Sequence, residues 1–271
     1  MPRTNRIYQT REKSLMEVMK AKGLIVQVIK LNDNDCLFTV LLDNMEKITA
    51  MSKGIRSMKH KDFAALKNMC YSELELKNRN GLYLVSSANI INNFYNLRNS
   101  LEKVSFATYV CEVAKTVSEY VVGDNDYFRF VLNTLYFMEN AENKAKDGDI
   151  ITELRRLKAF FEMRTCSHLG FAPSFHSCAK CSCQKELCYF SLSRGGVVCA
   201  DCKYESDIPI SEVERKLLAI MSEAEVKKVF SISNIDMTVV KKVEQITEKY
   251  LSNKVEYCFK SLEYLKKILE S

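Results

Sequence analysis

Short apolar runs separated by turn-forming residues fill the first third of the chain. Each run is rich in β-branched, aromatic or alternating apolar residues, and Asn and Asp residues mark most of the turns. The runs cover residues 23–30, 36–42, 46–51, 70–77 and 82–86. The last two flank a turn that ends in Asn80-Gly81, a pair typical of tight hairpins. Five strands this close together predict a small barrel of the OB type over residues 21–87.

Helical spacing replaces this pattern from residue 88 onward. Apolar residues recur every three or four positions over residues 101–121, 128–138 and 150–169. Further along, Ser211 and Glu214 fit a capping box that opens another helix, and two amphipathic stretches split near Ser252-Asn253 follow it. The sequence therefore predicts an α+β protein, in which an N-terminal five-stranded β-barrel is followed by an α-helical domain over residues 88–271.

Composition agrees with a soluble, helix-rich protein. The 271 residues include only 3 Pro and 8 Gly, and 47% are hydrophobic against 27% charged. The N-terminus lacks an apolar signal-like segment, and no apolar run approaches the roughly 20 residues of a membrane span. We therefore expect a cytoplasmic protein with no membrane contact, in which the isolated cysteines are packed as free thiols rather than bridged.

The excess positive charge is confined to the beginning of the chain. Residues 1–61 carry 12 Lys and Arg against 6 Asp and Glu, whereas the rest carries 28 Lys and Arg and 28 Asp and Glu. Much of the excess lies in a basic extension over residues 1–20, with Arg3, Arg6, Arg11 and Lys13, and in a loop after the third strand, with Lys53, Arg56, Lys59 and Lys61. Such residues neutralise phosphates, and OB barrels hold single strands at such loops. We predict nucleic-acid binding by both groups; a solvated loop and a terminal segment without a role are the alternatives.

Two CxxC pairs form the most specific chemical motif of the chain. Cys178 and Cys181 make the first pair, and Cys199 and Cys202 make the second. Each pair places two thiolates on one side of a tight turn, and two such turns make a tetrahedral S4 site for one Zn²⁺. Short β-rich runs around Gly195-Gly196 lie between the pairs, as in a zinc ribbon. A zinc-binding insertion is therefore predicted in the helical domain at about residues 175–205.

Four thiolates fill the coordination sphere, so this site is predicted to be structural rather than catalytic. Disulfides or buried free thiols are the alternatives. Cys183 and Cys188 lie nearby, and replacing Cys181 by either would lose the CxxC turn on that side. His176 is close enough in the sequence to support a ligand by a hydrogen bond.

Basic residues on the predicted third helix, and an absence of catalytic motifs, complete the sequence reading. Arg155, Arg156 and Lys158 are predicted to form a solvated face; the alternative is that they receive an acidic partner peptide. The sequence holds no GxxxxGK[ST] or GxSxG motif, and its Asp and Glu residues are spread along the chain rather than gathered as expected for a Mg²⁺ site. We therefore predict a binding protein rather than an enzyme. A zinc-ribbon nuclease and a barrel that binds a protein are the alternatives.

Five segments in this order resemble the bacterial RecO family of recombination mediators, over about residues 20–270. They are the opening strand Lys22–Val26, the barrel segment Ala50–Arg56 (A-x-x-K-G-x-R), the helix segment Ala107–Glu112 (A-x-Y-x-x-E), the helix exit Leu169–Pro173 (L-G-x-x-P), and the four cysteines with Phe190-Ser191 and Gly195-Gly196 between them. The chain departs from the family pattern in its N-terminal extension and in the Asn/Asp-rich turn Asn32–Asp35.

The resemblance implies a protein without enzymatic activity that acts in the RecF-type pathway of DNA repair. Members of this family bind single- and double-stranded DNA, anneal complementary strands and work with RecR. They help to load the recombinase onto DNA covered by the single-stranded DNA-binding protein, whose acidic C-terminal tail they contact. The expected partners of this chain are therefore DNA, RecR and that tail, and its expected location is the nucleoid.

Overall fold

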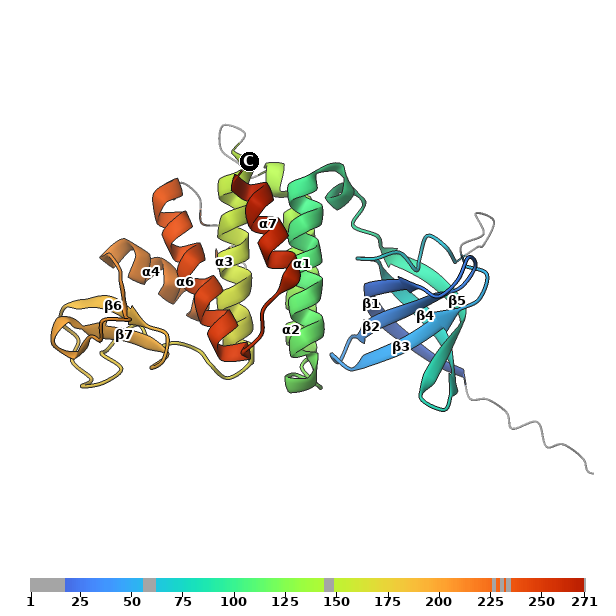
Figure 1. The fold of residues 1–271 in the computed structure, drawn as a ribbon, viewed down its shortest axis with the longest axis horizontal. Coiled ribbons are helices and arrows are strands. Elements are labelled where there is room, and N and C mark those ends of the chain that lie inside the picture. The colour runs from blue at the N-terminus through green and yellow to red at the C-terminus, as the bar shows by residue number, and fades with distance from the viewer. Residues whose placement is uncertain are drawn as a thin grey trace, which may run out of the picture.

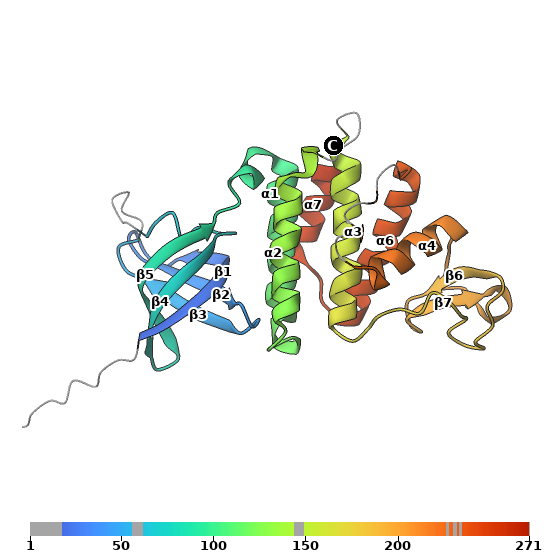
Figure 2. The same cartoon turned by 180° about the vertical axis from the view of Figure 1, so that it is seen from behind.

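The computed structural model describes residues 18–55, 62–143, 149–225, 228–229, 232 and 235–270. A β-barrel lies at one end of the molecule, helices lie in the middle, and a small β-sheet lies at the other end (Figure 1). The view from behind shows the same order (Figure 2). This arrangement confirms the predicted α+β fold, with an OB-type barrel ahead of a helical domain. Within the described ranges, no helix is both long and apolar enough to span a bilayer.

Five strands form the barrel: β1 (Val18–Lys30), β2 (Cys36–Leu42), β3 (Lys47–Ser52), β4 (Tyr71–Arg79) and β5 (Leu82–Asn92). They close in the order β1-β2-β3-β5-β4, with β3 and β5 parallel and the other neighbours antiparallel. β1 begins at Val18, ahead of the strand start predicted at residue 23 and of the barrel start predicted at residue 21. In the hairpin between β4 and β5, Asn80 and Gly81 have left-handed φ angles of 53° and 84°. This backbone geometry explains the Asn-Gly pair that predicted the hairpin.

The helical domain consists of α1 (Leu101–Val117), α2 (Asn125–Glu139), α3 (Ile150–His168), α4 (Glu212–Glu223), α6 (Met237–Val255) and α7 (Lys260–Glu270). The side chains that accept N-terminal backbone N–H groups of α1, α2, α3, α4 and α6 are Ser100, Asp124, Asp149, Ser211 and Asp236. The capping box predicted at Ser211 and Glu214 is confirmed. The two predicted amphipathic stretches are the helices α6 and α7, and the break between them lies a few residues later than predicted: α6 continues through Ser252 and Asn253 and ends where Glu256 takes a φ of 51°.

A continuous apolar core joins the barrel to the helices. Leu24, Leu41 and Met45 of the barrel are buried in the same cluster as residues of α1 and α2. Tyr71 of β4 packs edge-on against Phe128 of α2, with ring centroids 5.8 Å apart. Because burial of apolar surface is the main stabilising contribution to such contacts, the barrel is docked on the α1–α2 side rather than tethered to it.

The small sheet consists of β6 (Leu187–Ser191), β7 (Gly196–Cys199) and β8 (Ile208–Pro209), in the order β7-β6-β8. Phe190 packs edge-on against Tyr250 of α6, with ring centroids 5.4 Å apart. Gly195, between β6 and β7, has a φ of 64°, and a Cβ atom there would lie 2.9 Å from Tyr250 Oη. Glycine is required at this turn for both reasons. The sheet is therefore a clip that follows α3 in the chain and packs on α6.

Candidate functional site

A groove of about 490 Å³ opens at one end of the barrel. Apolar and cationic side chains line it: Val28, Lys30, Cys36, Phe38, Ile55, Phe63, Leu66, Lys67 and Asn68. The register of the sheet brings these segments together, because Lys30 pairs with Cys36 across β1 and β2, and Cys36 pairs with Ser52 across β2 and β3. Lys53 follows Ser52 directly and is exposed at the same end of the barrel.

The start of the basic loop is anchored to the turn between β1 and β2. The backbone N–H of Gly54 donates to Asp35 Oδ1 at 2.9 Å, and Asn32 Nδ2 donates to Asp35 Oδ2 at 2.9 Å. The hydrogen bond from Asn32, followed by the one from Gly54, lowers the pKa of Asp35 below its usual value. The ionised carboxylate thus keeps the backbone beside Lys53 at the end of the barrel.

Phe63 and Lys67 form a cation–aromatic pair that the sequence analysis missed. Phe63 is 38% exposed, and Lys67 Nζ lies 5.1 Å from the centroid of its ring. An exposed ring beside ammonium groups is a surface on which a nucleic-acid base can stack while a phosphate is neutralised. Both residues precede β4 in a segment that forms neither a helix nor a strand, and a phenylalanine between lysines is the sequence signal that indicates them.

The other predicted phosphate-binding residues lie outside the described part of the chain. Arg56, Lys59 and Lys61 belong to residues 56–61, and the four residues of the N-terminal extension belong to residues 1–17: Arg3, Arg6, Arg11 and Lys13. Their assignment stays a prediction from charge and sequence position. Of the predicted set, the structure describes Lys53, next to the groove.

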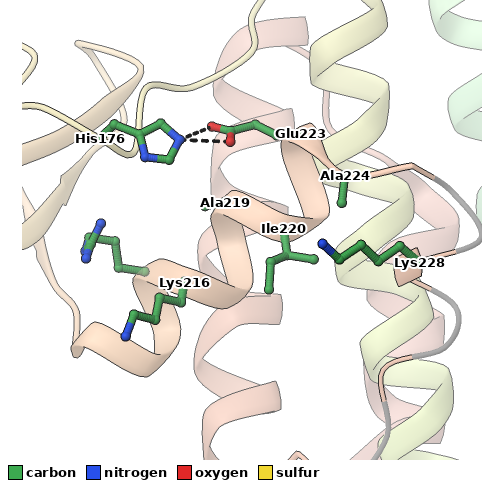
Figure 3. Close-up of a pocket in the computed structure, with 8 residues that line it drawn as sticks. His176, Lys216, Ala219, Ile220, Glu223, Ala224 and Lys228 are labelled. Atoms are coloured by element: carbon green, nitrogen blue, oxygen red, sulfur yellow. Dashed lines mark hydrogen bonds and ion pairs between the residues drawn. The ribbon is translucent and has the colours of Figure 1, made fainter.

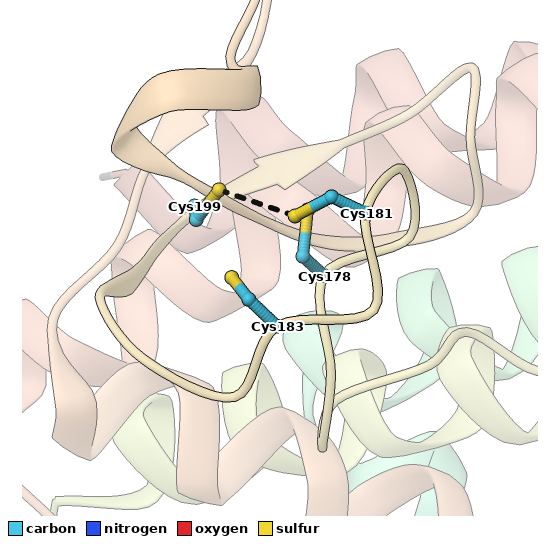
Figure 4. Close-up of side chains that lie close together, drawn as sticks. All are labelled: Cys178, Cys181, Cys183 and Cys199. Atoms are coloured by element: carbon cyan, nitrogen blue, oxygen red, sulfur yellow. Dashed lines mark hydrogen bonds between the residues drawn. The ribbon is translucent and has the colours of Figure 1, made fainter.

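Cysteine thiols gather beside the small sheet (Figure 4). The Sγ atoms of Cys178, Cys181, Cys183 and Cys199 all lie within 4.8 Å of one another, and Cys181 Sγ is 3.8 Å from Cys199 Sγ. A tetrahedral ion with metal–sulfur bonds of about 2.3 Å requires sulfur atoms about 3.8 Å apart. The four thiols therefore have the donor type and the spacing to hold a metal ion.

The composition of this group differs from the predicted one at one position. Cys178, Cys181 and Cys199 are predicted ligands, whereas Cys183 stands where Cys202 was predicted. Cys202 is not remote, because it packs against the buried residues Cys178 and Cys199. Spacing in the sequence indicated Cys183 only as a substitute for Cys181, since its position beside Cys181 depends on the way the chain bends after that residue.

Hydrogen bonds around the thiols shift their pKa values in opposite directions. Burial raises the pKa of Cys178, but hydrogen bonds from the backbone N–H groups of Cys181, Cys199 and Lys180 outweigh it and lower this pKa to about 6. A hydrogen bond with the Cys181 thiol raises the pKa of Cys183 to about 12. Because the thiolate is the form that binds a metal, Cys178 is prepared to act as a ligand at neutral pH.

A second groove, of about 530 Å³, lies along α4 (Figure 3). Its lining includes the cations Arg215, Lys216 and Lys228 and the apolar residues Ala219, Ile220 and Ala224. His176 also lines it, and His176 Nε2 lies 3.0 and 2.9 Å from the two carboxylate oxygens of Glu223. This histidine therefore contacts α4 through Nε2, and that nitrogen is directed at a carboxylate rather than at a thiol.

The predicted solvated face on α3 is also wrong, since its three cations are buried: Arg155, Arg156 and Lys158. Lys158 Nζ lies 2.8 Å from a carboxylate oxygen of Glu162, 3.0 Å from one of Glu248 and 3.5 Å from one of Glu244. Arg155 Nη1 lies 2.5 Å from the other oxygen of Glu244. Acidic residues of α6 thus supply counter-charges inside the domain, and these cations are not available to an acidic partner.

The fold and these sites define a two-domain protein in which an OB-type barrel, a class of fold that binds oligonucleotides, is docked on a helical domain with a thiol cluster. Two family models match along this division. "Recombination protein O N terminal" matches residues 16–94, and "Recombination protein O C terminal" matches residues 98–263. The chain belongs to the Recombination protein O, or RecO, family, as its five short segments indicated.

Relatives named DNA repair protein RecO match most of the chain. The protein of Acetivibrio thermocellus is 26% identical over 255 residues, which cover 93% of this chain and 97% of that protein. The protein of Caldicellulosiruptor bescii is 27% identical over 254 residues, which cover 93% and 99%. The protein of Caldicellulosiruptor saccharolyticus is 28% identical over 219 residues, which cover 80% and 85%. Family membership assigns the chain a role in DNA repair by recombination and implies interaction with DNA.

Proposed function

We propose that this protein is a recombination mediator that binds single- and double-stranded DNA, anneals complementary strands and helps to load the recombinase onto single strands. The groove at the end of the barrel carries the proposal, because Lys30 and Lys67 line it together with the exposed ring of Phe63. Lys53 adds a third exposed cation at this end. The excess positive charge of the chain lies within residues 1–61, which supply two of these lysines.

Annealing requires that two phosphate backbones approach while their repulsion is screened. In the proposed mechanism, a cationic loop neutralises phosphates without reading base edges, and Phe63 stacks on a base. The loop cations are Lys53, Arg56, Lys59 and Lys61, and Arg3, Arg6, Arg11 and Lys13 contribute further phosphate contacts. No covalent bond is made or broken in this process, so we propose that the protein is not an enzyme.

The double variant Lys53→Glu, Arg56→Glu should bind single-stranded DNA at least tenfold more weakly and should anneal more slowly. Each lost phosphate contact should also reduce the slope of log affinity against log salt by about 0.7. Fluorescence anisotropy over a salt series, together with a strand-annealing assay on DNA coated with the single-stranded DNA-binding protein, measures both effects. Binding and annealing equal to those of the unmodified protein would show that this site assignment is wrong.

A matched control and a second variant of the groove sharpen this test. Lys241→Glu, Lys249→Glu makes the same charge change at exposed positions of α6 and should leave binding nearly unchanged. Phe63→Ala should weaken binding by about 1–3 kcal/mol through lost stacking and leave the salt slope unchanged.

Labelled DNA incubated with Mg²⁺ or Mn²⁺ should stay intact. Cleavage of the DNA would favour a nuclease, and a salt-independent failure to bind DNA would favour a protein-binding barrel.

We propose that the thiol cluster holds one zinc ion per chain. Four thiolates in tetrahedral spacing suit zinc better than hard cations such as Mg²⁺, and a closed site of this kind is structural. When bound, the ion would cross-link the turn at Cys178–Cys183 to the end of β7. Figures 1 and 2 place β6 and β7 at the end of the molecule away from the barrel, so the cluster is distant from the proposed DNA groove.

We further propose RecR and the acidic C-terminal tail of the single-stranded DNA-binding protein as partners. The cations first considered for such a tail are buried, so another surface is required. The groove along α4 combines cations with apolar residues, and its cations have the charge that an acidic segment requires. We therefore assign the proposed tail contact to this groove.

Lys216→Glu should weaken the binding of a labelled acidic tail peptide about fivefold, because reversing one exposed charge changes the binding free energy by about 1 kcal/mol. Lys267→Glu makes the same change at an exposed position of α7 and serves as the control. Fluorescence anisotropy with the labelled peptide gives both affinities. Equal affinities for the two variants would show that the groove along α4 is not the site that binds the tail.

A further inference from the structure

Five cysteine thiols lie at the cluster, whereas a tetrahedral metal site takes four ligands. Cys178, Cys181 and Cys199 belong both to the CxxC pairs and to the close group in which all Sγ atoms lie within 4.8 Å of one another. Cys183 belongs to the close group but not to a CxxC pair. Cys202 belongs to a CxxC pair and packs against the same cluster. Cys178, Cys181 and Cys199 are therefore common to both possible sets of four ligands, the two CxxC pairs and the close group. Cys183 and Cys202 compete for the fourth position.

Cys183 reaches the cluster through the hydrogen bonds of its own turn. The N–H of Cys178 donates to the carbonyl of Cys183 at 2.7 Å, and the N–H of Ser182 donates to the carbonyl of Cys178 at 2.9 Å. Ser182 has a φ of 61°, which bends the chain back after Cys181. Figure 4 shows the Cys183 thiol directed toward the thiols of Cys178, Cys181 and Cys199. One loop therefore carries three thiols of the close group, those of Cys178, Cys181 and Cys183.

Cys202 reaches the cluster through a different segment. It ends the 3-10 turn Ala200–Cys202, which follows β7. Its carbonyl accepts a hydrogen bond from Arg194 Nη1 at 2.8 Å. The segments that carry Cys183 and Cys202 are held by separate contacts, so removing one thiol does not dismantle the backbone that positions the other.

We propose that Cys183 and Cys202 are interchangeable fourth ligands of one tetrahedral metal site, whose other three ligands are Cys178, Cys181 and Cys199. This inference rests on the proposed metal function of the cluster. A tetrahedral ion accepts four thiolates, so the fifth residue stays a protonated thiol beside the site. When either competing thiol is replaced or alkylated, the other occupies its position and four sulfur ligands remain.

Cobalt substitution tests this inference, because the intensity of thiolate-to-cobalt charge transfer reports the number of sulfur ligands. The full-length protein and the variants Cys183→Ser, Cys202→Ser and Cys183→Ser, Cys202→Ser are loaded with Co²⁺ and titrated with a chelator. Each single variant should keep a four-sulfur spectrum and an affinity within a few-fold of the unmodified protein. The double variant should show three sulfur ligands and bind the metal about 100-fold more weakly or worse.

The possible failures are distinguishable. A three-sulfur spectrum in Cys202→Ser, with Cys183 intact, overturns the interchange and leaves the predicted CxxC–CxxC set as the site. A three-sulfur spectrum in Cys183→Ser, with Cys202 intact, overturns it in favour of the close group. A protein that binds no cobalt overturns the metal assignment itself. Far-ultraviolet circular dichroism of each variant checks that a lost spectrum does not come from unfolding.

Alkylation of the zinc-loaded protein supplies a second measurement that needs no substitution. Metal-bound thiolates react slowly, so limiting iodoacetamide followed by peptide mass mapping finds the thiol that is not coordinated. Modification within the cluster should be divided between Cys183 and Cys202, with at most one of them modified per chain. Modification at only one of these two positions would contradict the interchange. The exposed Cys258, which is outside the cluster, serves as the internal reference for reactivity.

Discussion

Lys158→Met should lower the free energy of unfolding by about 3–5 kcal/mol, the usual effect of removing one partner from a buried ion pair. Lys158 and its partner Glu162 are both fully buried, with a nitrogen–oxygen distance of 2.8 Å. Methionine has the length of the lysine side chain without its terminal amino group, so the variant removes a charge without opening a large cavity. Urea unfolding followed by circular dichroism measures the change.

The large effect is expected because the carboxylates around Lys158 would lose their counter-charge in a buried site. Glu162 is also held by Tyr109 Oη of α1 at 2.8 Å and by Thr247 Oγ1 of α6 at 2.7 Å. Lys158 therefore stabilises a carboxylate at the point where α1, α3 and α6 meet. Hydrogen bonds alone do not offset the loss of a cation from such a site.

The effect of Lys158→Met should depend on pH. Burial raises the pKa of Glu162 to about 7 against the lowering effect of Lys158. Because this pKa lies above the usual value of 4.5, the folded state binds the proton more tightly, and the contribution of Glu162 to stability decreases as the pH rises through this range. Without Lys158 the pKa of Glu162 rises further. The variant should therefore be less destabilised at about pH 5, where Glu162 takes up a proton, than at about pH 8.

Lys266→Met is the matched control, since Lys266 Nζ contacts the same residue, Glu248, at 2.8 Å but is 47% exposed. A pair whose lysine is open to solvent contributes about 1 kcal/mol or less, so this variant should be nearly as stable as the unmodified protein. If Lys158→Met lowers the free energy of unfolding as little as Lys266→Met does, or by the same amount at both pH values, the buried ion pairs do not stabilise the domain as described.

Cys199→Ser should abolish metal binding and unfold the small sheet. Cys199 is buried at the end of β7 and belongs to both possible ligand sets, whereas Cys183 and Cys202 compete for a different position, so neither set is complete without Cys199. Structural zinc sites contribute about 10–16 kcal/mol of apparent binding free energy in zinc-finger peptides, and this energy is coupled to folding. Metal analysis should fall from one zinc per chain towards none, and limited proteolysis should cut within about residues 175–205.

Cys258→Ser controls for the loss of a thiol, because Cys258 is exposed and lies outside the cluster. It should keep one zinc per chain and the protease resistance of the unmodified protein. The barrel should stay folded in Cys199→Ser, since the clip packs at the opposite end of the helical domain (Figures 1 and 2). A fully folded, metal-free protein with a disulfide between Cys178 and Cys202 would contradict the structural zinc site.

Features that depend on neighbouring residues could be predicted from the sequence. The strands of the barrel follow from alternating apolar runs, and the β4–β5 hairpin follows from Asn80-Gly81, because strand and turn preferences act within a few residues. The helix start at Ser211 follows from a capping box for the same reason. The thiols of Cys178 and Cys181 share a turn that their spacing alone defines. In each case the cause and its effect lie within about one turn of chain.

Only the tertiary structure decided the features that depend on distant partners. Lys158 is buried because Glu248, 90 positions later in the chain, faces it from α6, and no local pattern on α3 contains that information. The pairing of β1, β2 and β3 places Lys30 and Lys53 at the end of the barrel where Phe63 and Lys67 complete the groove. In this protein the sequence determined the elements and the two CxxC pairs, whereas packing between elements decided which charges are exposed at the proposed DNA groove and which are buried in ion pairs.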